Sequence, residues 1–276
     1  MKDLSSLLKE KNFRCPARVL RIFVSKLKNI PNEQVMFAPE TVSLSENELE
    51  RLGEYIDRYN NGEPESKIIN CREFWRDTFF VDKNVLDPRP ETEIIIEVAL
   101  KLFSAESYFN FLDAGTGSGC ILLSLANEFQ NANGVGIELS GNAVAVANKN
   151  KENLRVKNAE IVQTSWNDFS PSHRFDLIVS NPPYIKSEDI VRLDKQVREF
   201  DPLLALDGGT LGLAAYEQLA PLVKQWINPK GHILLEIGIH QKDQVRDIFN
   251  SSGFRLAEVY NDLQGIPRVL HFVAEE

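Results

Sequence analysis

The spacing of apolar residues changes near residue 91, and this change divides the chain into two regions. From there to the C-terminus, short apolar runs alternate with stretches in which apolar residues recur every three or four positions. The runs predict strands and the stretches predict helices. The expected strands are 111–114, 134–138, 159–163, 175–180, 232–236, 254–260 and 269–274, and the expected helices are 92–103, 120–128, 141–153, 211–226 and 241–250.

This alternation is typical of an α/β sheet with helices on both faces. Only a loop fits between the last two expected strands, so we expect them to pair antiparallel. The fold class predicted for this region is a Rossmann-like sheet of seven strands with an antiparallel last strand.

The first 60 residues show helical spacing instead of strand alternation. Leu4, Leu7 and Leu8 begin this pattern, and it continues through 19–27. A Ser-Glu-Asn-Glu capping sequence, expected to begin at Ser43, precedes another amphipathic stretch. Runs 67–75 and 78–82 are β-prone and predict a hairpin, and the prolines of 87–90 predict an extended connector. We therefore expect a helical domain at 1–62, a hairpin and linker at 63–90, and the α/β domain at 91–276.

Charge is distributed unevenly over the 276 residues. The net charge is −9, whereas residues 1–28 carry eight Lys or Arg against two acids. An acidic α/β half argues against stable capture of a nucleic-acid backbone, which needs a basic surface. The basic N-terminal stretch is either a solvated helix face or a contact for RNA or an acidic partner.

Membrane, disulfide and metal chemistry are not indicated. No apolar run reaches the length of a membrane span, and charge interrupts the N-terminus where a signal peptide would be apolar. Three widely spaced cysteines, none in ligand spacing with a histidine, predict neither a disulfide framework nor a metal site. We expect a cytoplasmic protein without a metal.

A glycine-rich loop follows the first strand of the α/β region and leads directly into a helix. Its residues are Asp113, Gly115, Thr116, Gly117, Ser118 and Gly119. Glycines let the backbone approach a ligand, and the helix N-terminus offers free N–H groups. The spacing is G-x-G-x-G with an acid two positions before it, which differs from the dinucleotide fingerprint, and there is no Walker lysine.

Glu138 ends the next strand, 19 positions beyond Gly119, where a carboxylate can accept hydrogen bonds from both hydroxyls of a ribose. Asp113 would suit a positively charged amino-acid group, and Trp166 would line an adenine pocket. Together these residues indicate S-adenosylmethionine. The alternatives are that Asp113 caps its own loop, that Glu138 is an exposed acid, and that Trp166 belongs to the core.

The tetrapeptide Asn181-Pro182-Pro183-Tyr184 follows the apolar run 175–179. Prolines lack N–H groups, so the carbonyls of Asn181 and Pro182, with the Asn181 side chain, can accept hydrogen bonds from an NH2 group. Tyr184 can cover the planar group that carries this nitrogen. The arrangement suits an enzyme that modifies an amide or an exocyclic amine, and its alternative is a plain turn.

In this order and spacing, the loop, Glu138 and the tetrapeptide resemble the class I S-adenosylmethionine-dependent methyltransferases. More narrowly, the chain resembles the peptide chain release factor glutamine methyltransferase family, the HemK or PrmC family. The motifs that carry this resemblance are Glu73-Phe74-Trp75, Val85-Leu86, Pro88-Arg89-Pro90-Glu91-Thr92-Glu93, Ser165-Trp166, Ser180 to Ile185, Pro202, Ala205-Leu206, Gly208-Gly209, Leu234-Leu235-Glu236, Gly238 and Arg268. Four residues depart from the family pattern, namely Asp87, Ser165, Asp201 and Thr210.

The resemblance implies methyl transfer from S-adenosylmethionine, with S-adenosylhomocysteine as product, to the glutamine amide of the Gly-Gly-Gln loop in release factors. It implies that Asn181, Pro182 and Tyr184 orient the amide, without a general base. It also implies a substrate pocket that Pro183, Arg89, Pro90 and Thr92 help to close, with pairing to an acid as the alternative for Arg89. We expect a monomer whose N-terminal domain grips the release factor.

Two other functions fit parts of the sequence. A nucleic-acid amino methyltransferase, acting on adenine N6 or guanine N2, uses the same tetrapeptide around a flipped base. A binding module that senses S-adenosylmethionine would bind it without turnover. Methyl transfer to a release factor, rather than to RNA or to nothing, would distinguish the three.

Overall fold

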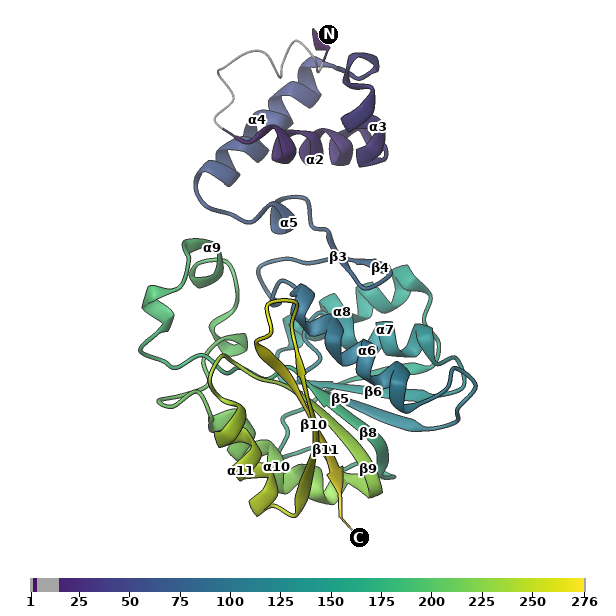
Figure 1. The fold of residues 1–276 in the computed structure, drawn as a ribbon. Helices are drawn as coiled ribbons and strands as arrows, with labels where there is room; N and C mark the ends of the chain where they lie inside the picture. The colour runs from purple at the N-terminus through teal and green to yellow at the C-terminus, as the bar shows by residue number, and fades with distance from the viewer. Residues whose placement is uncertain (1, 4–14, 276) are drawn as a thin grey trace. The chain divides into compact units, whose positions relative to one another are not determined.

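The computed structural model describes residues 2–3 and 15–275, which fall into two compact units, Met1–Cys71 and Arg72–Glu276 (Figure 1). Leu4, Leu7 and Leu8 lie outside the described residues. No described helix is long and apolar enough to cross a membrane.

The first unit is mainly helical, as expected. It contains the helices α2 (Ala17–Lys28), α3 (Asn32–Phe37), α4 (Glu46–Asn60) and α5 (Glu65–Ile68), the 3-10 helix η1 (Pro39–Thr41), and the short strands β1 (Lys2–Asp3) and β2 (Ser43–Leu44). Its core consists of the apolar stripes of α2 and α4 with Val35 and Leu44 between them. A helix with one apolar stripe must bury that stripe against a neighbour, and here α2 and α4 bury theirs together.

The helix α4 begins with a capping box, but its first residue differs from the one expected. Ser45, rather than Ser43, accepts a hydrogen bond from the Glu48 N–H, and the Glu48 carboxylate accepts one from the Ser45 N–H. These two bonds satisfy donors that the first turn of a helix leaves free.

The predicted hairpin is shorter than its β-prone runs. Strands β3 (Arg72–Phe74) and β4 (Asp77–Phe79) pair antiparallel around Trp75 and Arg76. Residues 65–68, which overlap the first run, form α5 instead, directly after Pro64, whose fixed φ suits the residue before a helix.

The second unit contains the predicted seven-stranded sheet. Its strands are β5 (Asn110–Ala114), β6 (Asn133–Glu138), β7 (Ala159–Gln163), β8 (Phe175–Ser180), β9 (Ile227–Glu236), β10 (Phe254–Asn261) and β11 (Pro267–Ala274), in the order β10-β11-β9-β8-β5-β6-β7. β11 pairs antiparallel with both β10 and β9, and the other pairs are parallel. The antiparallel last strand is confirmed.

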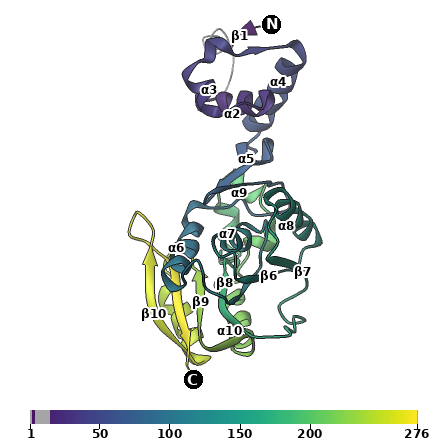
Figure 2. The same cartoon turned by 90° about the vertical axis from the view of Figure 1, so that its right-hand side faces the viewer.

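Helices cover both faces of this sheet (Figures 1 and 2). They are α6 (Glu93–Leu102), α7 (Cys120–Glu128), α8 (Gly141–Leu154), α10 (Ala214–Trp226) and α11 (Lys242–Ser251). Neighbouring strand residues enter different cores: Phe111 packs with α6 and α7, whereas Leu112 packs with α10 and α11. Likewise, Leu234 lies in the same core as Phe111 and Leu235 in the same core as Leu112, because successive side chains of a strand point to opposite faces.

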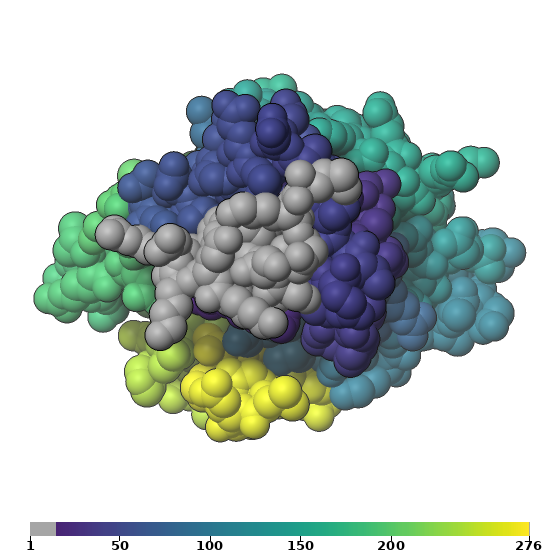
Figure 3. Space-filling model, turned by 90° about the horizontal axis from the view of Figure 1, so that it is seen from above, coloured from purple at the N-terminus to yellow at the C-terminus, as the bar shows by residue number. Residues whose placement is uncertain are grey.

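The segment between β8 and α10 is the longest connection in the sheet. It contains the 3-10 helices η3 (Ile190–Arg192) and η4 (Leu203–Ala205) and the helix α9 (Lys195–Arg198). The space-filling view shows this segment, in green, at the surface (Figure 3). A further 3-10 helix, η2 (Pro90–Thr92), leads from the connector into α6.

Candidate active site

A cavity of about 400 Å³ lies in the second unit, where β5, β6, β7 and β8 end. Ligands of open parallel sheets bind at this edge. Its wall consists of residues 84–86, 88–89 and 92 of the connector, 115–118 and 120–121 after β5, 138–140 and 143 after β6, 164–166 after β7, 181–183 after β8, and 202, 204–205, 207, 214–215 and 218.

The glycine loop approaches this cavity because its glycines adopt positive φ. Gly115, Gly117 and Gly119 have φ of 88°, 55° and 82°. The N–H groups of Gly115 and Thr116 bond the Ile137 carbonyl, which ties the loop to the neighbouring strand. A Cβ on Gly117 would meet no atom within 4 Å, so the wall is open there for a ligand. Gly119 instead packs closely, since a Cβ would lie 3.1 Å from Leu123.

Glu138 lies on the wall and is held by the backbone. One carboxylate oxygen accepts from the Gly117 N–H at 3.0 Å, and the other accepts from the Ser140 N–H at 2.9 Å. Each oxygen keeps a lone pair for a further donor. The carboxylate is therefore oriented before any ligand binds, which suits recognition of two neighbouring hydroxyls.

Asp113 lies behind the loop and does not line the cavity. Its Oδ2 accepts from the Thr116 hydroxyl at 2.6 Å and from the Leu122 N–H at 3.2 Å. Burial raises the pKa of this carboxyl to about 7. The geometry is that of an acid that caps its own loop, the alternative considered above, and it does not give Asp113 direct access to a ligand.

Trp166 lies on the wall, after β7, and packs against the core beneath α10 and α11. Its ring comes within 3.6 Å of the position that a Cβ on Gly115 would take. The side chain thus serves the cavity and the core together.

Asn181, Pro182 and Pro183 line the cavity beside the connector. The Asn181 Nδ2 donates to Thr92 Oγ1 at 3.1 Å, and Thr92 Oγ1 donates to Glu236 Oε2 at 2.5 Å. Among the described residues, no hydrogen bond reaches Asn181 Oδ1 or the Pro182 carbonyl oxygen. These two acceptors are the free polar atoms that the tetrapeptide predicted.

Tyr184 is not on the cavity wall, contrary to the expectation that it covers the substrate. Its hydroxyl donates to Glu236 Oε1 at 3.3 Å, and its carbonyl accepts from Gln241 Nε2 at 2.9 Å. Burial, with the nearby Glu236 carboxylate, raises the pKa of the Tyr184 phenol. Tyr184 therefore fixes the backbone after the two prolines.

Glu236 is the residue that the sequence interpretation missed as part of the site. It ends β9, is 2% exposed, and bonds both Thr92 and Tyr184. Burial raises its pKa to about 7. An acid directly after an apolar run is the same signal that singled out Glu138, so the sequence could have indicated it.

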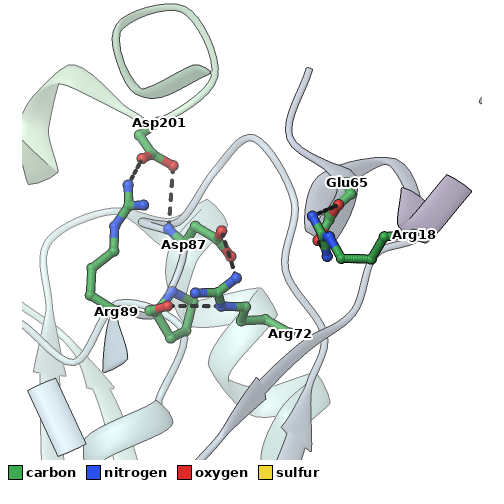
Figure 4. Close-up of polar contacts among 7 residues, drawn as sticks. Arg18, Glu65, Arg72, Asp87, Arg89 and Asp201 are labelled. Carbon is green, nitrogen blue, oxygen red and sulfur yellow. Dashed lines mark hydrogen bonds and ion pairs between the residues drawn. The ribbon is translucent and has the colours of Figure 1, made fainter. Parts of the chain in front are cut away.

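Of the three connector residues expected to close the substrate pocket, Arg89 and Thr92 line the cavity, whereas Pro90 is exposed and off the wall. Arg89 Nη2 bonds the Asp201 carboxylate at 2.8 Å, and that carboxylate is 1% exposed (Figure 4). The guanidinium thus pairs with an acid, the alternative considered for Arg89.

Two departures from the family pattern meet at this pair. Asp201 also accepts from the Asp87 N–H at 3.2 Å, and the Asp87 carboxylate lies 3.8 Å from the Arg72 guanidinium (Figure 4). Arg72 in turn donates to the Pro88 carbonyl at 2.9 Å. The connector is therefore held at the cavity by polar contacts with Asp201 and with Arg72. Within the first unit, Figure 4 also shows Arg18 bonded to Glu65.

The chain matches known proteins over most of its length. A family model described as a methyltransferase domain matches residues 105–253. A release factor glutamine methyltransferase of Caulobacter vibrioides is 38% identical over 264 residues, covering 95% of this chain and 91% of that protein. The chain belongs to the release factor glutamine methyltransferase family.

A second member of this family, from Agrobacterium fabrum, is 35% identical over 257 residues, covering 91% of this chain and 88% of that protein. Among solved structures, a methyltransferase of Pyrococcus furiosus has a TM-score of 0.52 at 18% identity, covering 84% of this chain and all of that one. The fold and family predicted from the sequence are confirmed.

The residues on the wall fit S-adenosylmethionine, which this family uses. The carboxylate of Glu138 suits ribose hydroxyls, the open wall at Gly117 admits a ligand, and Trp166 offers an aromatic face. Among residues 2–3 and 15–275, no group of three or more His, Cys, Asp or Glu side chains could hold a metal ion.

Proposed function

We propose that this protein transfers the methyl group of S-adenosylmethionine to the side-chain amide nitrogen of the glutamine in the Gly-Gly-Gln motif of release factors. The observation that carries the proposal is the pair of free acceptors, Asn181 Oδ1 and the Pro182 carbonyl, on a cavity that Glu138 and the glycine loop also line. Family membership supplies the identity of the amide.

The proposed roles follow from the chemistry of an amide nitrogen, which is a poor nucleophile because its lone pair is delocalised. Asn181 Oδ1 and the Pro182 carbonyl accept its two N–H bonds, so fixed dipoles stabilise the positive charge that develops on nitrogen. They also hold the nitrogen in one orientation, which lowers the entropic cost of reaction. The released proton passes to water.

S-Adenosylmethionine supplies an electrophilic methyl group on its sulfonium. Glu138 would hold the ribose, Gly115 to Ser118 would surround the methionine part, and Trp166 would cover the adenine. Asp113 would act indirectly, by bracing the loop through Thr116 and Leu122. The connector, held by Arg89 and Asp201, would close the substrate side.

For the first unit we propose contact with the body of the release factor. For the whole protein we propose a cytoplasmic location, consistent with a substrate from translation. An acidic α/β half suits a partner with a basic surface, and release factors must themselves approach RNA.

The test is an incubation with methyl-labelled S-adenosylmethionine and either a release factor or ribosomal RNA. We expect label in the release factor, and in the peptide that contains Gly-Gly-Gln. A release factor with Gln→Ala in that motif is the matched control and should stay unlabelled. Label in RNA alone would refute the proposal and favour the nucleic-acid enzyme, and binding without any label would favour the sensor.

A further inference from the structure

Three polar side chains connect the cavity wall to the end of β9. Asn181 donates to Thr92, and Thr92 donates to Glu236 at 2.5 Å. Thr92 is 2% exposed and Glu236 is 2% exposed, so water does not reach either group freely. The chain of bonds therefore transmits the state of a buried carboxylate to a residue on the wall.

The direction of these hydrogen bonds depends on the charge of Glu236. A carboxylate only accepts, so the single hydroxyl hydrogen of Thr92 goes to Glu236 Oε2. Thr92 Oγ1 is then left only with lone pairs toward Asn181, and it can bond the NH2 side of that amide alone. The amide oxygen is thereby turned away from Thr92 and left free.

We propose that Glu236 is a positioning residue that, through the Thr92 hydroxyl, holds the Asn181 amide with its oxygen free to accept from the substrate amide. This inference rests on the proposed function and adds to it the group that sets the orientation of Asn181. Asn and Gln amides are nearly symmetric in shape, so only their hydrogen-bond partners distinguish the two orientations.

Protonation of Glu236 removes this constraint. A carboxyl O–H can donate to Thr92 Oγ1, which frees the Thr92 hydrogen to bond Asn181 Oδ1. The amide can then turn and present its NH2 group to the substrate NH2, and two donors repel. Methyl transfer should therefore fall as pH falls through the pKa of Glu236, which burial raises to about 7.

Among the described residues, other titratable groups lie near Glu236 on the elements around it. They are Glu91 in η2, Tyr184 after β8, Cys120 in α7, Tyr216 in α10, whose hydroxyl donates to the Glu236 carbonyl, and Arg268 in β11. Burial raises the pKa of Cys120 to about 12 and raises that of Tyr216, so both stay neutral near pH 7. Arg268, paired with Asp262 at 2.9 Å, favours the ionised form of Glu236.

The first test compares Thr92→Val with Thr92→Ser, at saturating S-adenosylmethionine and release factor. Valine keeps the shape but has no hydroxyl, and we expect kcat to fall about tenfold, the effect of roughly one orienting hydrogen bond, with KM little changed. Serine keeps the hydroxyl and should keep both kcat and the acid limb of its pH profile. Should Thr92→Val not fold, Glu236→Gln carries the test.

Glu236→Gln cannot ionise, so its kcat should be low and without the acid limb near pH 7. The matched control is Asp113→Asn, because burial also raises the pKa of Asp113 to about 7 while its contacts are to Thr116 and Leu122. The control should keep the acid limb. An acid limb that persists in Glu236→Gln or in Thr92→Val would overturn the proposal.

A measurement without catalysis separates this inference from the proposed function. In protein labelled with ¹⁵N-asparagine, the side-chain amide resonance of Asn181, assigned from its loss in Asn181→Ala, should shift as pH passes through the pKa of Glu236. The shift should be absent in Glu236→Gln, and its presence there would overturn the relay. A protein that shows the relay but methylates no release factor would refute the proposed function alone.

Discussion

The substitution Glu138→Gln tests most sharply how the cofactor is held. In the structure the two carboxylate oxygens accept from the Gly117 N–H at 3.0 Å and the Ser140 N–H at 2.9 Å. A glutamine keeps one acceptor oxygen and points an NH2 group at the other N–H. It also loses the charge that favours two ribose hydroxyls as donors.

The magnitude follows from the bonds that are lost. A hydrogen bond to a charged group contributes about 1.5–3 kcal/mol, so the Kd for S-adenosylmethionine should rise by about 10-fold to 150-fold. Isothermal titration calorimetry with S-adenosylhomocysteine, the product, measures this without turnover. Glu160→Gln is the matched control, since it removes the same charge from an exposed position on neighbouring β7, off the cavity wall. If the Kd of Glu138→Gln for S-adenosylhomocysteine equals that of Glu160→Gln and of the unchanged protein, the ribose role of Glu138 is refuted.

Four further predictions, one of them with a control variant, give distinct outcomes. Asn181→Ala should lower kcat by about 100-fold or more, the cost of removing one preorganised hydrogen-bonding group that stabilises charge in a transition state, while calorimetry shows S-adenosylhomocysteine still binding. Near-normal turnover would refute its role. Gly134→Ala should lower the free energy of unfolding by about 1–3 kcal/mol, because the added Cβ would lie 2.4 Å from the Phe111 ring. The control Gly53→Ala adds a Cβ with nothing within 4 Å and should not lower the free energy of unfolding; denaturant unfolding measures both variants. Asp201→Ala should cost about 1–3 kcal/mol, since it leaves Arg89 and the Asp87 N–H without this partner, whereas an unchanged denaturation midpoint would contradict the connector clamp. Glu236→Gln should raise the melting temperature relative to the unchanged protein above pH 7 but not below pH 4.5. Burial raises the pKa of Glu236 from 4.5 to about 7, so ionised Glu236 destabilises the folded state increasingly as pH rises through this window. An equal difference in melting temperature at all pH values would contradict this prediction.

Much of the fold could be predicted because strands and helices leave different spacings in the sequence. The run 175–180 and the order of the elements predicted a parallel sheet with helices on both faces, and the loop after 254–260 predicted the antiparallel last strand. Element boundaries differ from the prediction where the local sequence suits more than one structure. Residues 67 and 68 begin a run predicted as β-prone, yet they belong to α5, which directly follows Pro64. Strand β9 begins at Ile227 rather than near His232.

The sequence predicted which strand ends form the cavity wall, but not which residues at those ends are buried away from it. Gly117, Glu138 and Asn181 lie at or within three residues of the ends of β5, β6 and β8, so their place at one edge of the sheet follows from topology. Asp113 and Tyr184 follow the same rule in sequence, but burial decides their roles: one braces the loop and the other bonds Glu236. Which of two polar residues at a strand end faces the ligand depends on side-chain packing, which spacing alone does not encode.

Contacts between residues far apart in the sequence could not be predicted. Thr92 and Glu236 are 144 positions apart, and Arg89 and Asp201 are 112 apart. A single sequence contains no signal for such pairs. Asp87 and Asp201, two of the departures from the family pattern, are 114 positions apart, and the structure brings them into one cluster with Arg89.

The most direct test of the central claim is mass spectrometry of release factor purified from cells that lack this gene. The glutamine of Gly-Gly-Gln should be unmethylated in those cells, methylated when the unchanged gene is restored, and unmethylated when the restored gene carries Asn181→Ala. Methylation that persists without the gene, or that Asn181→Ala restores fully, would contradict the account.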